Sequence, residues 1–221
     1  MPNLYIIATP IGNLEDITLR ALRVLKDVNI ILCEDTRHTK KLLAKYEINT
    51  PTISYHQHSK LNKINKIVDL LECGKNLALV SDAGTPGISD PGNQLIKYLI
   101  ENKIDVEIIP IPGPSAVISA LSVSGFPTDN FIFMGFVPHK KGRQTFFKNI
   151  AEEKRTVAFY ESPHRILKAL DSMQKFFPKK EIVVCRELTK IYETVYRGKA
   201  KDIKKTLTPD QVKGEFVVVA R

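Results

Sequence analysis

The sequence predicts an α/β protein of two domains, the first built on a mostly parallel sheet and the second on a mixed sheet. In the first half, short apolar runs that stop at glycine and proline turns alternate with amphipathic stretches, as in βαβ units. In the second half, the last three apolar runs have little helix between them, which favours antiparallel neighbours. Between the halves, the segment 122–129 contains Gly125 and Pro127 and breaks both patterns. We therefore expect domains at residues 1–123 and 124–221.

The first domain is expected to contain five strands, which begin at Leu4 and then cover Val28–Cys33, Thr52–His56, Leu77–Val80 and Val106–Ile109. A helix with its apolar stripe at Ile17, Ala21, Leu22, Val24 and Leu25 follows the first strand, and a helix around residues 60–73 follows the third. After the fifth strand, Gly113 turns the chain and Pro114 occupies the first position of a helix that runs through Leu121.

The segment from Leu77 to Gly92 organises this domain. A strand buried on both faces ends at Ser81-Asp82, where open α/β sheets bind their ligands. The corner that follows is rich in residues that permit close backbone approach or stiffen a turn, namely Gly84, Pro86, Gly87, Pro91 and Gly92. Ser89 is the expected cap of the next helix, whose first turn holds Asp90 and Pro91 and whose buried stripe is Leu95, Ile96, Leu99 and Ile100.

Two polar clusters stand at the ends of other strands. Glu34-Asp35-Thr36-Arg37 is placed where open sheets carry function, and a helix start with Thr36 as its cap is the alternative. His56 and His58 could bind a metal, but no third ligand stands nearby in the sequence, so substrate contact or plain surface is favoured.

The second domain is expected to contain strands at Phe131–Val137, Thr156–Ser162, Glu181–Glu187, Glu193–Gly198 and Glu215–Ala220, and helices near 143–152 and 163–177. Ser162 and Pro163 are the expected cap and first residue of the second helix.

Composition indicates a globular protein. Of the 221 residues, 43% are hydrophobic and 26% are charged, and no apolar run approaches the ~20 residues of a membrane span. The N-terminus has no basic segment before its short apolar run, so we expect no signal peptide, no membrane partner and a cytoplasmic location. Cys33, Cys73 and Cys185 form no C-x-x-C pair, and we expect reduced thiols in or near the core.

The net charge of +9 lies entirely in the second half. Residues 1–110 carry 13 Lys+Arg and 13 Asp+Glu, whereas residues 111–221 carry 20 and 11. A one-sided basic surplus favours a phosphate-rich partner, and a merely solvated lysine surface is the alternative. The cations expected to contact phosphates are Lys140, Lys141 and Arg143 after the Phe136-Val-Pro-His turn, and Arg165 and Arg186 at strand ends.

The sequence contains neither a P-loop nor a dinucleotide fingerprint. Instead, the corner Asp82-Ala-Gly-Thr-Pro-Gly-Ile-Ser-Asp-Pro-Gly92 closely resembles the signature of the small-subunit ribosomal RNA methyltransferase I family, within the tetrapyrrole methylase superfamily of class III methyltransferases. The resemblance extends over essentially the whole chain. Its other motifs are Tyr5-Ile-Ile-Ala-Thr-Pro-Ile-Gly-Asn13, Cys33-Glu-Asp-Thr-Arg37, Ser54-Tyr-His56, Pro112-Gly-Pro-Ser-Ala116, Phe159-Tyr-Glu-Ser-Pro-His-Arg165, Arg186-Glu-Leu-Thr-Lys190 and Gly214-Glu-Phe216.

The resemblance implies a two-domain, usually dimeric enzyme that methylates a cytidine ribose 2′-hydroxyl in small-subunit (16S) ribosomal RNA or a ribosomal particle. The methyl donor is S-adenosylmethionine, no metal is used, and the donor lies in the cleft between the domains. Carried over by motif, the donor-binding residues are Ile11, Ala83, Gly84, Thr85, Ile88, Ser115, Ala116, Glu161 and Glu187. Gly84 and Thr85 are expected to offer backbone groups to the methionine part. Family members commonly continue into a small C-terminal extension, and this chain is expected to lack the RNA contacts of that extension.

Proton removal from the 2′-hydroxyl requires an acceptor at a strand end. Glu34, Asp35, His56, Asp82 and Glu161 qualify by position. We nominate the Glu34–Asp35 pair and His56, with Arg37 orienting a phosphate.

Two other functions stay open. A methyltransferase for a tetrapyrrole precursor shares the fold, but its first loop would read Gly-x-Gly-Pro-Gly-Asp, whereas this one reads Ala8-Thr-Pro-Ile-Gly-Asn13. The other is a donor-binding or RNA-binding module without catalysis.

Overall fold

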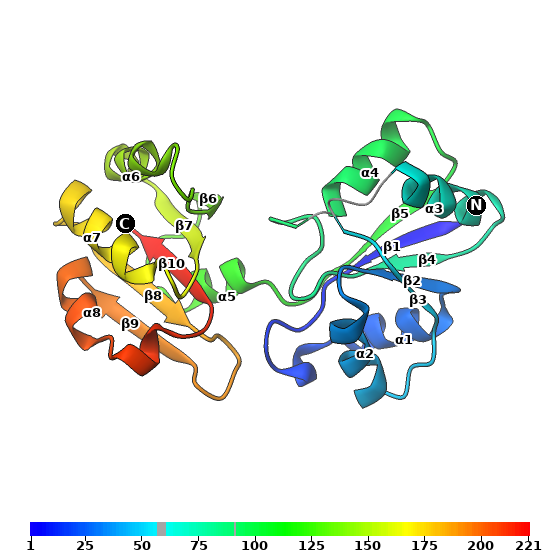
Figure 1. The fold of residues 1–221 in the computed structure, drawn as a ribbon, viewed down its shortest axis with the longest axis horizontal. Helices are drawn as coiled ribbons and strands as arrows, with labels where there is room; N and C mark the ends of the chain where they lie inside the picture. Colours follow the sequence, from blue (N-terminus) through cyan, green and yellow to red (C-terminus); the bar gives the residue numbers. More distant parts are fainter. Residues whose placement is uncertain (57–60, 91) are drawn as a thin grey trace. The chain divides into compact units, whose positions relative to one another are not determined.

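The computed structural model describes residues 1–56, 61–90 and 92–221, and these form two compact units, Met1–Ser115 and Ala116–Arg221 (Figure 1). His58 and Pro91, both named above, lie outside the described residues. The units divide earlier than the expected 123/124 boundary because helix α5 (Ala116–Ser122) packs with the second unit. Its Val117, Ala120 and Leu121 share a buried apolar cluster with strands of the second sheet.

The first unit holds one parallel sheet of five strands in the order β3-β2-β4-β1-β5. The strands are β1 (Asn3–Ile7), β2 (Ile30–Cys33), β3 (Thr52–Ser54), β4 (Leu77–Leu79) and β5 (Glu107–Ile111). The helices are α1 (Leu19–Asp27), α2 (Thr36–Lys45), α3 (Leu61–Glu72) and α4 (Gly92–Glu101), with a short 3-10 turn η1 (Leu14–Asp16). The predicted βαβ pattern and parallel sheet are confirmed.

Two apolar clusters cover the two faces of this sheet. Side chains of α1 and α2, among them Val24, Leu25 and Leu42, pack on one face, and side chains of α3 and α4, such as Leu71 and Leu95, pack on the other. Figure 1 shows the same arrangement, with α1 and α2 on one side of the strands and α3 and α4 on the other. A strand sandwiched in this way must be apolar on both faces, as the run at β4 is.

Several predicted helix starts in the first unit are wrong. Helix α2 has Asp35, not Thr36, as its cap, because the Asp35 carboxylate accepts the Arg37 N–H at 2.8 Å. Helix α4 begins at Gly92 rather than after Ser89, and Asp90 Oδ1 accepts the Gly92 N–H at 2.8 Å.

Two further expectations near helix ends are also wrong. Ile100 is 63% exposed and does not belong to the buried stripe of α4. Pro114 precedes α5, which begins at Ala116, so the proline is not its first residue.

The second unit holds a mixed sheet of five strands in the order β6-β7-β10-β8-β9, in which β6 and β7 are parallel and β10 runs antiparallel to both β7 and β8. The strands are β6 (Phe131–Phe136), β7 (Thr156–Glu161), β8 (Ile182–Arg186), β9 (Thr194–Gly198) and β10 (Phe216–Ala220). The helices are α6 (Arg143–Glu152), α7 (Ile166–Phe176) and α8 (Ala200–Thr206), followed by a 3-10 turn η2 (Pro209–Val212). The antiparallel pairs β8–β9 and β8–β10 confirm the predicted mixed sheet.

The sequence did not predict α8, and it placed the start of α7 too early. Ala200 and Ile203 of α8 pack into the core beside α7, so burial rather than helix length secures this short helix. Helix α7 begins at Ile166 after a turn over residues 163–165, and its cap is Arg165, not Ser162.

Cys33 and Cys185 are buried free thiols, as expected, whereas Cys73 is exposed and the core position expected for it is wrong. Within the described ranges, none of the helices combines the length and apolarity that crossing a bilayer requires.

Candidate functional site

The carboxyl ends of all five parallel strands meet at one edge of the first sheet, the usual ligand position in such folds. Most of the residues predicted for the site lie in the loops at this edge. They are Ile11 after β1, Glu34 and Asp35 after β2, His56 after β3, Ala83, Gly84, Thr85 and Ile88 after β4, and Ser115 after β5.

The loops after β1 and β4 are joined by hydrogen bonds. The Thr9 N–H donates to the Gly84 carbonyl and the Gly84 N–H donates to the Thr9 carbonyl, both at 2.9 Å. The Thr9 hydroxyl, almost fully buried, donates to the Ser81 carbonyl at 3.1 Å. The Gly84 N–H is therefore engaged by Thr9, and the pairing fixes the position of the glycine in the loop after β4.

Two further contacts bring the predicted donor-binding residues together. A Cβ added at Gly84 would lie 3.5 Å from Ile11 Cγ2, so the side chain of Ile11 covers the glycine. Gly84 also has φ +78, a backbone conformation in which any residue with a side chain is strained. The Thr85 hydroxyl donates to the Pro114 carbonyl at 3.2 Å, which joins the loop after β4 to the loop that carries Ser115.

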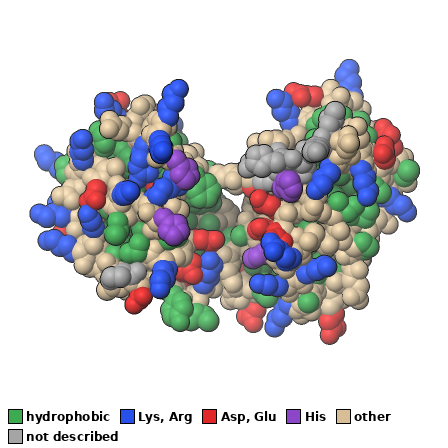
Figure 2. Space-filling model, viewed as in Figure 1, with side chains coloured by type: hydrophobic (Ala, Val, Ile, Leu, Met, Phe, Trp, Pro, Cys, Tyr) green, Lys and Arg blue, Asp and Glu red, His purple; other side chains and the backbone are tan. Residues whose placement is uncertain are grey.

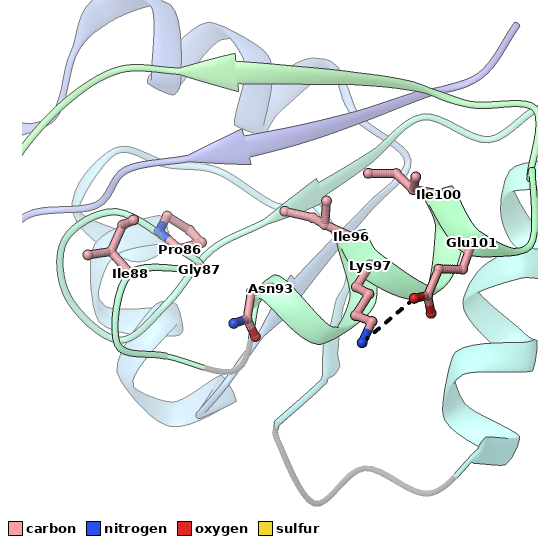
Figure 3. Close-up of a pocket in the computed structure, with 8 residues that line it drawn as sticks. All are labelled: Pro86, Gly87, Ile88, Asn93, Ile96, Lys97, Ile100 and Glu101. Carbon is pink, nitrogen blue, oxygen red and sulfur yellow. Dashed lines mark ion pairs between the residues drawn. The ribbon is translucent and has the colours of Figure 1, made fainter. Parts of the chain in front are cut away.

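The Ile88 N–H donates to the Thr85 carbonyl at 3.4 Å, so Ile88 belongs to the same loop. It is 50% exposed and lines an open groove of about 540 Å³ between the loop after β4 and helix α4 (Figure 3). Figure 3 shows Ile88, Pro86 and Gly87 on the loop, and Ile96 and Ile100 on the helix.

Glu34 and Asp35 are adjacent but have different environments, and Asp35 serves a structural role. The Asp35 carboxylate caps α2 and accepts hydrogen bonds from Arg37 Nε and Nη2, the latter at 2.7 Å. These bonds from Arg37 lower the pKa of Asp35 to about 2, so Asp35 is ionised at neutral pH and is a poor proton acceptor. The Asp35 N–H in turn donates to Asp82 Oδ1 at 3.1 Å, which fixes the loops after β2 and β4 together.

Glu34 has the opposite environment. Burial, and then the neighbouring charges of Asp82, Asp90 and Asp35, raise its pKa. Its side chain lines a small cavity of about 10 Å³, room for about one water molecule, together with Tyr55 and Asp90. Carboxylates therefore dominate this part of the edge, an electrostatic setting that suits a cation.

The other two nominated residues are also at this edge. His56 follows directly on the buried Tyr55, and its side chain is partly buried. The Arg37 guanidinium pairs with Asp35 but is 88% exposed, so much of it faces solvent. In the described ranges, no three His, Cys, Asp or Glu side chains are grouped as ligands for a metal ion.

In the second unit, Glu161 is the centre of a buried ion-pair cluster. Its side chain is 0% exposed, and its two oxygens pair with Arg165 Nη2 at 2.9 Å and Arg143 Nη1 at 3.2 Å. The Ser162 N–H donates to the same carboxylate at 2.8 Å. Each guanidinium is only 16% exposed and pairs with Glu161, so burial keeps both from the expected phosphate contact.

Arg186 was also expected to contact phosphate, and this expectation is wrong. The residue is buried and its guanidinium donates to three backbone carbonyls, those of Lys213 at 2.8 Å, Tyr192 at 3.1 Å and Asp210 at 3.4 Å. It therefore holds the loops at this end of the second sheet.

Glu187 and Ala116 complete the predicted set. The Glu187 carboxylate accepts from Lys190 Nζ and from the Glu215 N–H, both at 2.9 Å. Burial opposes ionisation, but these hydrogen bonds outweigh it and lower the pKa of Glu187. Ala116 is the first residue of α5 and is partly buried.

Sequence reasoning missed Thr9 and Asp90, which hold the loops at the edge of the first sheet. Asp90 receives the N–H groups of both Gly87 and Gly92. An aspartate between glycines in a turn is the signal that could have identified it, because its short side chain readily accepts nearby backbone N–H groups.

Comparison with known proteins identifies the family. The sequence model of the tetrapyrrole (corrin/porphyrin) methylases matches residues 3–204. Proteins named ribosomal RNA small subunit methyltransferase I from Synechocystis sp. and Thermotoga maritima are 47% and 44% identical to the chain over 98% and 99% of its length. The match covers 77% of the first protein and 98% of the second. This chain belongs to the ribosomal RNA small subunit methyltransferase I family.

Solved structures show that the fold of this family member is that of the tetrapyrrole methylases. A cobalt precorrin-4 methyltransferase of cobalamin biosynthesis matches with a TM-score of 0.74 at 20% identity, over 99% of this chain and 94% of that one. A uroporphyrin-III C-methyltransferase from Thermus thermophilus, complexed with S-adenyl homocysteine, matches with a TM-score of 0.66 at 14% identity, over 98% and 96%. The predicted fold class and family are thus confirmed.

Proposed function

We propose that this protein transfers the methyl group of S-adenosylmethionine to the ribose 2′-hydroxyl of a cytidine in small-subunit (16S) ribosomal RNA. The observation that carries the proposal is the assembly of Ile11, Gly84 and Thr85 at the carboxyl edge of the first sheet, within a family whose named members act on ribosomal RNA. The relatives at 43–48% identity favour RNA over a tetrapyrrole precursor, because the tetrapyrrole enzymes match at only 13–20%.

The edge of the first sheet fits the donor chemically. S-adenosylmethionine supplies an electrophilic methyl group on a positively charged sulfonium. Glu34, Asp82 and Asp90 lie at this edge and give it a negative potential, while Arg37 is neutralised by Asp35. Ile11 offers an apolar surface beside Gly84, where a larger residue would fill the space.

In the reaction, the 2′-oxygen forms a bond to the methyl carbon as the carbon–sulfur bond breaks and its electron pair remains on sulfur. The hydroxyl proton must pass to an acceptor, because a protonated hydroxyl is a weak nucleophile. Glu34 is the preferred carboxylate for this role, since its raised pKa makes it a better base than Asp35. His56 is the second candidate, and Arg37 presents an exposed guanidinium that can orient a phosphate.

The donor site is tested by the substitution Gly84→Val. A side chain at φ +78 beside Ile11 should weaken donor binding measured by calorimetry at least tenfold. Gly74→Val is the matched control, because Gly74 has φ +74 and a Cβ there would meet nothing within 4 Å. Equal donor affinities in the two variants would overturn the placement.

The chemistry is tested by single-turnover methyl transfer with saturating donor and unmodified 16S ribosomal RNA. Glu34→Gln and His56→Ala should slow the step without changing donor affinity, whereas Asp35→Asn should act through stability. Transfer of labelled methyl groups into porphyrin precursors would favour a methyltransferase for a tetrapyrrole precursor. Transfer to no acceptor at all would favour a donor-binding or RNA-binding module without catalysis. Near-normal rates in both Glu34→Gln and His56→Ala would show that catalysis here is mostly positioning.

We further propose that the enzyme is a cytoplasmic homodimer and that its substrate is the RNA alone or an assembling ribosomal particle. Light scattering after gel filtration gives the mass of the assembly. A comparison of naked RNA with subunits as methyl acceptors identifies the substrate.

A further inference from the structure

The buried cluster around Glu161 joins two loops of the second unit into one surface. Arg143, at the start of α6, and Arg165, before α7, both pair with Glu161 at the end of β7. Arg165 Nη1 also donates to the Val137 carbonyl at 2.8 Å, and the Val137 N–H donates to Tyr160. The loop after β6, residues 137–142, and the loop after β7, residues 162–165, are therefore held side by side.

The side chains that these loops turn outward are basic and imidazole groups. His139, Lys140 and Lys141 of the first loop are exposed, as are His164 and, in the first turn of α7, Lys168. Neither of the segments 136–143 and 162–168 contains an acidic residue. Figure 2 shows Lys, Arg and His side chains gathered on the visible face of this unit. Arg143 and Arg165, two of the five cations expected to contact phosphate, instead pair with Glu161 inside the cluster.

An aromatic ring stands beside these cations. Phe136, the last residue of the edge strand β6, is 56% exposed, although apolar residues of this size are usually buried. Its ring packs edge-on against Tyr160 with centroids 5.1 Å apart, and Tyr160 packs in the same way against Phe133. The ring is thus supported by its neighbours while more than half of the residue stays in solvent.

Exposed aromatic rings among cations are the means by which proteins bind single-stranded RNA, because bases stack on the ring while the cations contact phosphates. We propose that Phe136, His139, Lys140, Lys141, His164 and Lys168 form a binding surface for single-stranded RNA, with a base on Phe136 and phosphates on Lys140 and Lys141. The inference rests on the proposed function, since it takes ribosomal RNA as the substrate. The sequence analysis expected Arg143 and Arg165 to contact phosphates, whereas in this proposal they support the surface from below.

The experiment measures binding of unmodified 16S ribosomal RNA over a range of salt concentrations. Lys140→Ala/Lys141→Ala should lower the slope of log affinity against log salt by roughly 1.4, about 0.7 for each phosphate contact on a single strand. Phe136→Ala should weaken binding about 5- to 100-fold with an unchanged salt slope, and Phe136→Tyr should retain the affinity.

The matched control is Lys154→Ala/Lys179→Ala, which removes the same charge from the opposite end of the sheet, where β7 and β8 begin. An equal change of slope in this control would indicate that the lysines of the second half form only a solvated surface. Unchanged RNA affinity in both surface variants, with wild-type methyl transfer intact, would overturn the surface but leave the proposed function standing. A wild-type protein that transfers no methyl group to RNA would instead overturn the proposed function.

Discussion

The substitution Glu161→Gln tests the buried cluster most directly. It removes the one carboxylate that pairs with Arg143 and Arg165 among the described residues while keeping the size of the side chain, and the amide oxygen can still accept the Ser162 N–H. Two guanidinium groups, each 16% exposed, would then face one another without a counter-charge. Breaking a buried pair in this way costs about 3–5 kcal/mol.

For a protein of this length, a loss of about 3–5 kcal/mol lowers the melting temperature by roughly 6–20 °C. Circular dichroism during heating and during urea unfolding measures the change. Arg165→Gln should cost less than Glu161→Gln, because Glu161 keeps Arg143 as its partner and the excess charge disappears. The double variant should recover part of the loss, since it leaves a single arginine uncompensated.

Glu153→Gln is the control at an exposed pair. Hydrogen bonds from Arg155 lower the pKa of Glu153 to about 2, but solvent screens this pair, so its loss should shift the melting temperature little. The reasoning is refuted if Glu161→Gln melts within about 2 °C of the wild type, a change of less than about 1 kcal/mol.

Two further predictions concern loops at the ends of the sheets. Gly214→Ala should destabilise the protein by about 1–3 kcal/mol in urea unfolding, because a Cβ there would lie 2.5 Å from Glu187 Cδ and would force that carboxylate off its hydrogen bonds with Lys190 and Glu215. Gly198→Ala, at φ +132 with nothing within 4 Å, carries backbone strain alone and should cost less; equal losses would contradict the clash. Asp35→Asn should lower the melting temperature at pH 6 but not at pH 2. Because folding lowers the pKa of Asp35 from 3.8 to about 2, the ionised carboxylate stabilises the fold above pH 3.8, and this effect is lost as the pH falls towards 2. A difference from wild type that persists at pH 2, or that high salt leaves unchanged, would show that the Asp35 charge does not cause it.

Local sequence determined much of the fold. Short apolar runs located the strands of the described residues, and the helix expected near 143–152 matches α6 at Arg143–Glu152. These features depend on neighbours within a few residues, which the sequence displays directly. The chain order of the motifs was likewise sufficient to identify the family.

Helix starts were predicted less well, because adjacent residues compete for the same N–H groups. Asp35 caps α2 where Thr36 was expected, and Asp90 rather than Ser89 accepts an N–H at the start of α4. Both members of each pair are good capping residues, so propensity cannot choose between them.

Only the tertiary structure decided which charged residues are free. Arg143 and Lys141 are near neighbours in the sequence, yet Lys141 is exposed and Arg143 is held by Glu161, 18 residues away along the chain. Arg186 is held by carbonyls 6, 24 and 27 residues distant. The partner and the burial of a charge depend on segments that meet only in the folded sheet, so the sequence by itself determined that the second half is basic, and the fold determined which cations can reach a ligand.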